Sequence, residues 1–135
     1  MAYIVRDDIE VYFGAGNVAK WADLDNDGVV ATISARIAVA IADAESYVNA
    51  FLEGGVYDVP FVTVPAEVRR ATALLAGVDI YGSRGVDDTE GEKTPIERRR
   101  DEAVELLQLI RSGELVLNGQ TRSTTAPAVI EDDVT

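Results

Sequence analysis

Residues 31–53, ATISARIAVAIADAESYVNAFLE, repeat apolar side chains at intervals of three and four positions. This spacing collects them on one face of a helix, and the predicted stripe is Ile33, Ile37, Ile41, Ala44, Val48 and Phe51 or Leu52. Polar side chains fall on the opposite face, at Arg36, Asp43, Glu45 and Asn49. We therefore predict a helix over 31–53, roughly 30 Å long, which is capped by Thr32 or Ser34 and stopped by Gly54 and Gly55.

Three further segments show helical spacing. Residues 6–13 pair Ile9 with Phe13 on one face, and residues 17–21 add one or two turns. Residues 65–81 start at a proline, which suits a first helical turn, and their apolar side is Val68, Ala71, Leu75, Val78 and Tyr81. Residues 94–112 start with Thr-Pro-Ile-Glu, a capping box with proline at the first helical position, and their stripe is Ala103, Leu106, Leu107 and Ile110.

The segments between and after these helices predict few strands. Residues 56–65 contain Pro60, which cannot donate a ladder hydrogen bond, so we expect an extended apolar connector there. Residues 114–118, Glu-Leu-Val-Leu-Asn, alternate like one short strand that Gly119 closes. The predicted fold is all-α: a small bundle of four to five helices over residues 1–119, with at most one or two short strands at 56–64 or 114–118. An extended C-terminal tail follows over residues 120–135.

Composition argues against an enzyme, a DNA-gripping domain and a membrane protein. The 135 residues include no cysteine and no histidine, which removes the commonest general base, the best nucleophile and the common zinc ligands. We expect no catalytic residue and no cofactor. The net charge of −12 disfavours a grip on DNA, which needs clustered Lys and Arg. No apolar run approaches the ~18 residues that span a bilayer, and the N-terminus is too acidic for a signal peptide.

Residues 23–28, Asp-Leu-Asp-Asn-Asp-Gly, resemble the start of a calcium-binding loop. Asp23, Asp25 and Asp27 occupy the first three acidic positions of such a loop. The twelfth position, which should be a bidentate glutamate, is Ser34 instead. The alternative is a cluster of Asx turns in which Gly28 adopts a positive φ. We therefore expect no functional metal at Asp23, Asp25 and Asp27.

Eight of the twelve basic residues lie within residues 54–112, and three of them are consecutive, at Arg98, Arg99 and Arg100. This run covers nearly a full turn of the predicted last helix. It is either a solvated face, with Asp101, Glu102 and Glu105 as helical partners, or a basic patch that meets acids on a neighbouring subunit.

The tail over 120–135 is too polar to fold by itself. Within it, Val129 and Ile130 belong to a short apolar island that precedes Glu131, Asp132 and Asp133. This tail is either an ordinary terminus or an anchor that docks on a partner. We expect Val129 and Ile130 to make buried contacts with a partner, while the three acids face basic groups.

Four segments in this order resemble the Mu-like head-tail connector (head-completion) proteins of tailed bacteriophages. The first is the opening AYIVRDDIEVYFG over 2–14, and the second is the Gly28 turn before an alanine-rich helix that ends in FLEG over 51–54. The third is the connector VPFVTVP over 59–65, which precedes a helix ending in IYG over 80–82. The fourth is IRSGEL over 110–115, at the end of the last predicted helix. Val5 stands where the family often has a threonine or serine cap. The resemblance covers about residues 2–119.

The resemblance implies a virion protein of the phage neck, made in the cytoplasm of the bacterial host. Such proteins form a ring of copies, usually twelve, below the portal, and join it to a tail-side stopper or tail terminator protein. DNA passes through the ring without sequence-specific binding. Two alternatives do not depend on the resemblance: a small acidic calcium-responsive module, from the turn over 23–28, and an acidic binding module that mimics DNA, from the composition.

Overall fold

Five helices and their connections make up the part of the chain that the computed structural model describes, residues 2–83 and 95–120. They are α1 (Arg6–Phe13), α2 (Ala15–Ala22), α3 (Val30–Leu52), α4 (Ala66–Gly82) and α5 (Pro95–Ser112). The predicted all-α class is confirmed, and the four main helices begin and end within one residue of the predicted bounds. None of the five helices combines the length and hydropathy that a transmembrane span requires.

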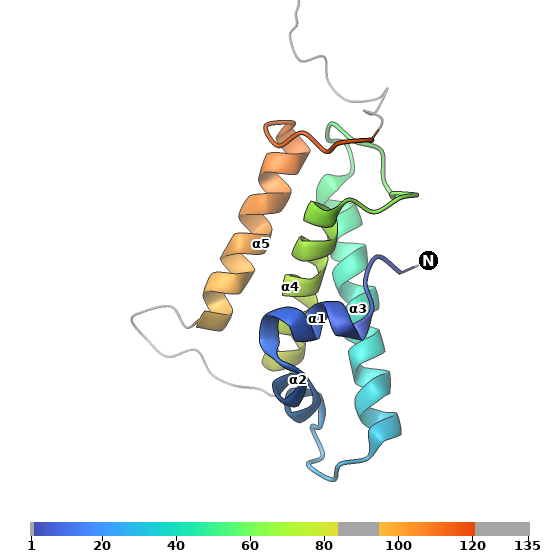
Figure 1. Ribbon diagram of the computed structural model, residues 1–135, viewed down its shortest axis with the longest axis vertical. Helices are drawn as coiled ribbons and strands as arrows, with labels where there is room; N and C mark the ends of the chain where they lie inside the picture. Colours follow the sequence, from blue (N-terminus) through green and yellow to red (C-terminus); the bar gives the residue numbers. More distant parts are fainter. Residues whose placement is uncertain (1, 84–94, 121–135) are drawn as a thin grey trace, which may run out of the picture.

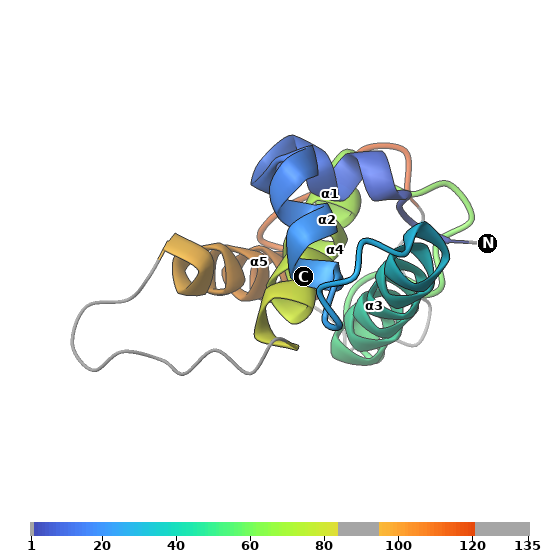
Figure 2. The same cartoon turned by 90° about the horizontal axis from the view of Figure 1, so that it is seen from below.

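Helix α4 lies at the centre of the bundle and packs against each of the other four helices. Helices α3 and α5 flank it on opposite sides, and α1 and α2 cover one of its remaining faces (Figures 1 and 2). The opposite face of α4, between α3 and α5, has no described helix over it (Figure 2). This arrangement leaves one covered and one open side of the central helix.

The predicted stripes of α3 and α5 form the flanks of the core. Ile33, Ile37, Ala44, Val48 and Leu52 are buried on α3. On α5, Ala103, Leu107 and Ile110 are fully buried, while Leu106 is partly buried against the core. These helices each meet the bundle along one face, which is why a simple apolar repeat locates their buried sides.

The apolar face predicted for α4 is only partly buried. Val68 and Ala71 are buried as expected, but Leu75, Val78 and Tyr81 are only half-buried. The small residues of this helix, which the sequence suggests as a surface for a closely packed neighbour, are buried instead at Ala73, Ala76 and Gly77, and so is Thr72. The small size of these residues lets the neighbouring helices approach closely, as the contact of Gly77 with Phe13 shows.

The connector between α3 and α4, residues 53–65, forms neither helix nor strand, and two tyrosines fix it to the bundle. The Tyr3 hydroxyl accepts a 2.8 Å hydrogen bond from the Phe61 amide and donates one of 2.6 Å to Asn49 Oδ1. The Tyr57 hydroxyl accepts a 2.8 Å hydrogen bond from the Leu117 amide. No β-strand is formed in residues 2–83 or 95–120. The alternation over 114–118 instead marks burial, with Leu117 inside and Val116 exposed.

Two helix starts differ from the predicted caps. Helix α3 begins at Val30, so Thr32 and Ser34 lie inside it and the predicted cap is wrong. The Asp27 side chain instead accepts a 3.0 Å hydrogen bond from the Val29 amide just ahead of the helix. At α1 the missing cap at Val5 is compensated because Asp8 Oδ2 accepts a 2.9 Å hydrogen bond from the Val5 amide.

Several predicted features lie outside the described residues. Thr94, the first residue of the predicted capping box, is one of them, although Pro95 does open α5. The interface candidates of the tail also lie there, at Val129, Ile130, Glu131, Asp132 and Asp133.

Candidate functional site

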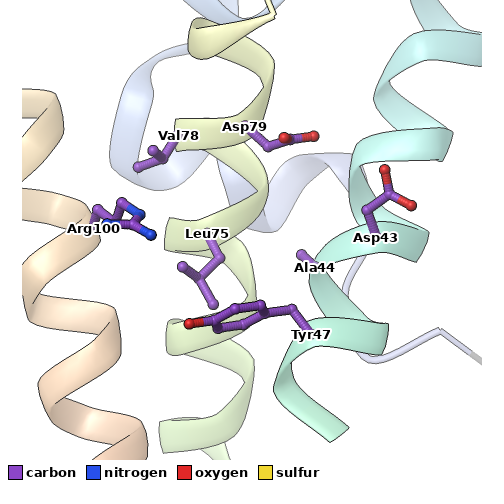
Figure 3. Close-up of a pocket in the computed structure, with 7 residues that line it drawn as sticks. All are labelled: Asp43, Ala44, Tyr47, Leu75, Val78, Asp79 and Arg100. Atoms are coloured by element: carbon purple, nitrogen blue, oxygen red, sulfur yellow. The ribbon is translucent and has the colours of Figure 1, made fainter. Parts of the chain in front are cut away.

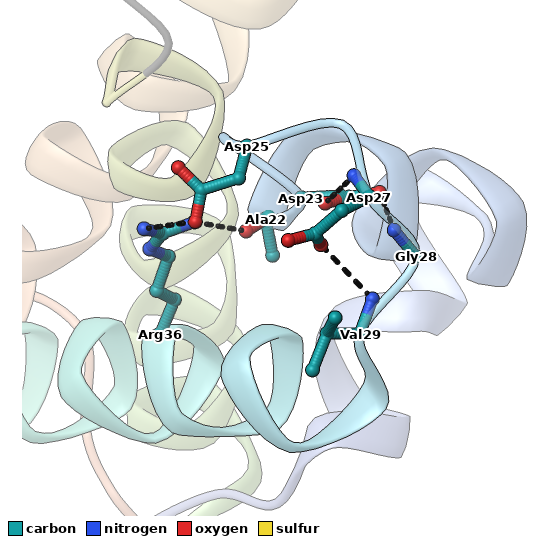
Figure 4. Close-up of polar contacts among 7 residues, drawn as sticks. All are labelled: Ala22, Asp23, Asp25, Asp27, Gly28, Val29 and Arg36. Atoms are coloured by element: carbon teal, nitrogen blue, oxygen red, sulfur yellow. Dashed lines mark hydrogen bonds and ion pairs between the residues drawn. The ribbon is translucent and has the colours of Figure 1, made fainter.

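The acidic turn between α2 and α3 is closed by hydrogen bonds to its own backbone (Figure 4). Both carboxylate oxygens of Asp23 are used: Oδ1 accepts from the Asp27 amide at 3.1 Å, and Oδ2 accepts from the Gly28 amide at 2.9 Å. Gly28 has a φ of 69°, the conformation that the Asx-turn interpretation requires. The turn is therefore a structural connection in which Asp23 holds the backbone of the following residues.

The other two acids of the turn point to different partners. Asp25 forms an ion pair with Arg36 of α3, with 3.4 Å between Oδ2 and Nη2, and Asp27 accepts from the Val29 amide. Within the described part of the chain, no three acidic side chains gather closely enough to hold a metal ion. The geometry favours the Asx-turn alternative, and the absence of a functional metal remains a prediction.

Replacing Asp23 with alanine is expected to lower the free energy of unfolding by about 1 kcal/mol, because two backbone hydrogen bonds are lost. Asp25→Ala removes only an exposed ion pair and should cost less than half of that. Thermal unfolding followed by circular dichroism checks both variants, with and without millimolar calcium. A calcium-dependent rise in the Tm of the unaltered protein that Asp23→Ala abolishes would contradict the structural interpretation of the turn.

The arginine run of α5 does not form one patch. Arg99 turns toward α1 and α4, where its guanidinium lies 5.8 Å from the centre of the Tyr12 ring and 3.6 Å from Glu102 Oε1. Arg70 of α4 lies 4.9 Å from the same ring centre and donates to Glu102 Oε2 at 2.7 Å. Arg99 thus belongs to an internal cluster with Tyr12, Arg70 and Glu102, which ties α1, α4 and α5 together.

Arg98 and Arg100 differ from Arg99. Both are exposed, and neither forms an ion pair with another residue of the described part. Arg100 stands on the wall of a groove that opens over α4. The sequence predicts basic residues on this helix. It does not indicate that Arg99 would lie beside Tyr12 and Arg70.

The groove lies on the open face of α4 and has a volume of about 260 Å³ (Figure 3). Leu75 and Val78 of α4 form its floor, and the seven residues that line it are Asp43, Ala44, Tyr47, Leu75, Val78, Asp79 and Arg100. Asp79 extends toward α3, where Asp43 lies, and Arg100 occupies the opposite wall. The groove is therefore apolar at its base, negative beside α3 and positive beside α5.

Partial desolvation of its carboxyl group raises the pKa of Asp79 above the ordinary value, and the nearby charge of Asp43 raises it further. The other charged groups that border Asp79 are Arg36 of α3 and Arg100 of α5. Folded protein therefore holds the Asp79 proton more tightly than unfolded protein does. The ionised form of Asp79 lowers stability once the pH rises above its pKa.

Asp79→Asn is expected to raise the free energy of unfolding at pH 7 by up to about 0.5 kcal/mol, the usual scale of a surface substitution. The gain should appear as the pH rises through and above the ordinary aspartate pKa near 4, and should vanish at lower pH, where Asp79 is protonated in both states. Denaturant unfolding of the two proteins across this range measures the difference. A gain that is equal at every pH would contradict the raised pKa.

Comparison with known proteins gives one clear match. The family model of bacteriophage Mu, Gp36, matches residues 3–135, nearly the whole chain. No curated protein matches. Membership of this phage family marks the chain as a phage structural or morphogenetic protein, and the Mu-like resemblance of the sequence is confirmed at that level. The chain belongs to the bacteriophage Mu Gp36 family.

Proposed function

We propose that this protein is a head-tail connector, which forms a ring of copies below the portal and extends the DNA channel toward the tail. The match to the bacteriophage Mu Gp36 family over residues 3–135 is the observation that carries the proposal. The portal protein on the head side and a stopper or tail terminator protein on the tail side are the proposed partners. The proposed location is the virion neck.

Two unlike outer faces of the bundle support a ring. A ring built from identical copies needs two different, complementary surfaces on each copy. Helices α3 and α5 lie on opposite sides of α4 (Figure 2). Asp43 is the single exposed charged residue of α3, whose exposed face includes Ala31, Ser34, Ala35, Ala38, Val39 and Ala42. Helix α5 instead exposes charged side chains, among them Arg98, Asp101 and Glu105. Small residues on one side allow close approach by long side chains from the next copy.

The acidic character of the chain suits a DNA channel. With 24 acids against 12 bases, a lumen formed by such subunits would repel phosphate instead of neutralising it. DNA would then pass without being held. The closed acidic turn fits the same role, because its carboxylates are occupied by the backbone and by Arg36 and serve as structure.

A phage with the gene for this protein inactivated tests the proposal directly. We expect infected cells to accumulate DNA-filled heads and free tails that do not join, and complementation with the intact gene to restore joined particles. Electron microscopy of the lysates, and of virions carrying a tagged copy, should place the protein in a ring at the neck. Normal tailed particles without this protein would exclude the connector role.

A further inference from the structure

The open face of α4 is a feature of the bundle that the connector role does not use. On the opposite face, Gly77 is buried against Phe13 of α1. On the open face, Leu75 and Val78 are only half-buried although they belong to the central helix. Tyr47 of α3 leaves 43% of its surface exposed beside them. The groove between α3 and α5 therefore presents an apolar floor and an aromatic wall to an outside partner (Figure 3).

Size and charge define what fits this groove. Its volume of about 260 Å³ falls below the range of ~300–1,000 Å³ that is usual for small-molecule sites, which suits side chains inserted from another chain. A lysine or arginine stem could lie along Leu75 and Val78 with its charged head beside Asp43 and Asp79. The Tyr47 ring would add a cation–π contact. Arg100, on the other wall, could form an ion pair with an acidic side chain on the opposite flank of the same partner.

From these features we infer that the groove over α4 is a docking site for a basic amphipathic helix of another protein, which inserts apolar side chains onto Leu75 and Val78 and places a lysine or arginine beside Asp43 and Asp79. Groove walls formed by two helices favour a third helix as the occupant, with anchors spaced three and four positions apart. Asp43 and Asp79 border the side of the groove next to α3, and Arg100 borders the side next to α5. The basic flank of the docked helix must therefore face α3, and its acidic flank must face α5.

Charge argues against two occupants that this chain itself could provide, its C-terminal segment and a second copy. Residues 121–135 carry Glu131, Asp132 and Asp133 but only Arg122 as a base. That segment would bring like charges to Asp43 and Asp79. A second copy of the chain carries twice as many acids as bases. A basic segment of a different protein complements the groove where these two do not.

A synthetic helical peptide tests the groove. It carries leucines at positions i, i+3 and i+7, lysines along one flank and glutamates along the other, and its binding to the full chain is measured by fluorescence anisotropy. We expect Asp43→Asn/Asp79→Asn to weaken binding by about tenfold or more. The matched control Asp58→Asn/Glu105→Gln removes the same charge elsewhere and should leave binding unchanged. No binding by the unaltered protein, or an equal loss in both variants, would overturn the proposal.

A photo-reactive amino acid at position 78 provides the second test in phage-infected cells. We expect the cross-link to map to a basic helical segment of another protein, and to disappear in the Asp43→Asn/Asp79→Asn background. Cross-links to a second copy of this chain, or to residues 121–135, would overturn the proposal. Peptide binding to the isolated protein measures the groove alone, and ring formation by the unaltered protein measures the connector role alone. A failure of the groove and a failure of the connector role are therefore separate results.

Discussion

Gly77→Ala is expected to destabilise the bundle by about 1–3 kcal/mol, the usual cost of overpacking a core. A Cβ atom at this position would lie less than 3.0 Å from three ring carbons of Phe13. The ring has little room to retreat, because Phe13 packs edge-on against Trp21, with centroids 5.9 Å apart, and Trp21 packs against Tyr81. Glycine is thus required where α1 crosses the central helix.

The sign of the effect makes this prediction sharp. Alanine normally stabilises a helix interior relative to glycine by roughly 1 kcal/mol, so Gly77→Ala reverses the ordinary expectation. Gly82→Ala is the matched control in the same helix, because its added Cβ meets nothing within 4 Å. Thermal and denaturant unfolding should show a loss for Gly77→Ala and no loss for Gly82→Ala. Phe13→Leu/Gly77→Ala should recover part of the loss, and equal stability of the two alanine variants would disprove the close contact.

The sequence predicts a helix well where that helix meets the core along one face. The repeat from Ile33 to Leu52 locates both α3 and its buried side, because its solvent side differs in composition. Helix α4 lacks that contrast, since neighbours surround most of it. Its small residues, such as Ala73 and Ala76, indicate close packing but do not identify which helix packs against them. The possible short strand around Leu117 does not form, because a strand also needs a partner that the sequence does not identify.

The candidate sites show the same limit. The role of Gly28 can be predicted because its positive φ is a local requirement of the turn. The contacts of Arg99 cannot be predicted in this way, because Tyr12 and Arg70 come from distant parts of the chain. Asp43 and Asp79 are likewise brought together only by the packing of α3 against α4. Pairings between elements depend on the order of the helices in space, which local patterns do not encode.

Arg98→Glu/Arg100→Glu is expected to reduce the yield of joined particles by orders of magnitude if the exposed arginines of α5 meet acids on a neighbouring subunit. One exposed ion pair contributes only about 0–1 kcal/mol, but the same pair recurs at every contact around a ring, and each reversal replaces attraction with repulsion. The middle arginine should stay unaltered. Arg99→Glu would place a carboxylate beside Glu102 and would remove a cation from Tyr12, so it would weaken the monomer as well.

Complementation of a phage lacking the gene measures the effect, with titre and electron microscopy as the readouts. Arg98→Lys/Arg100→Lys keeps the charge and should complement normally, and circular dichroism should show an unchanged fold for both double variants. Arg98→Glu and Arg100→Glu should also be tested singly. Because Arg100 lines the groove and Arg98 does not, the two single variants distinguish an effect on the outer face of α5 from an effect on the groove. If particles carrying Arg98→Glu/Arg100→Glu acquire tails at normal yield, the arginines of α5 are only a solvated face, and the contacts between subunits must lie elsewhere on the bundle.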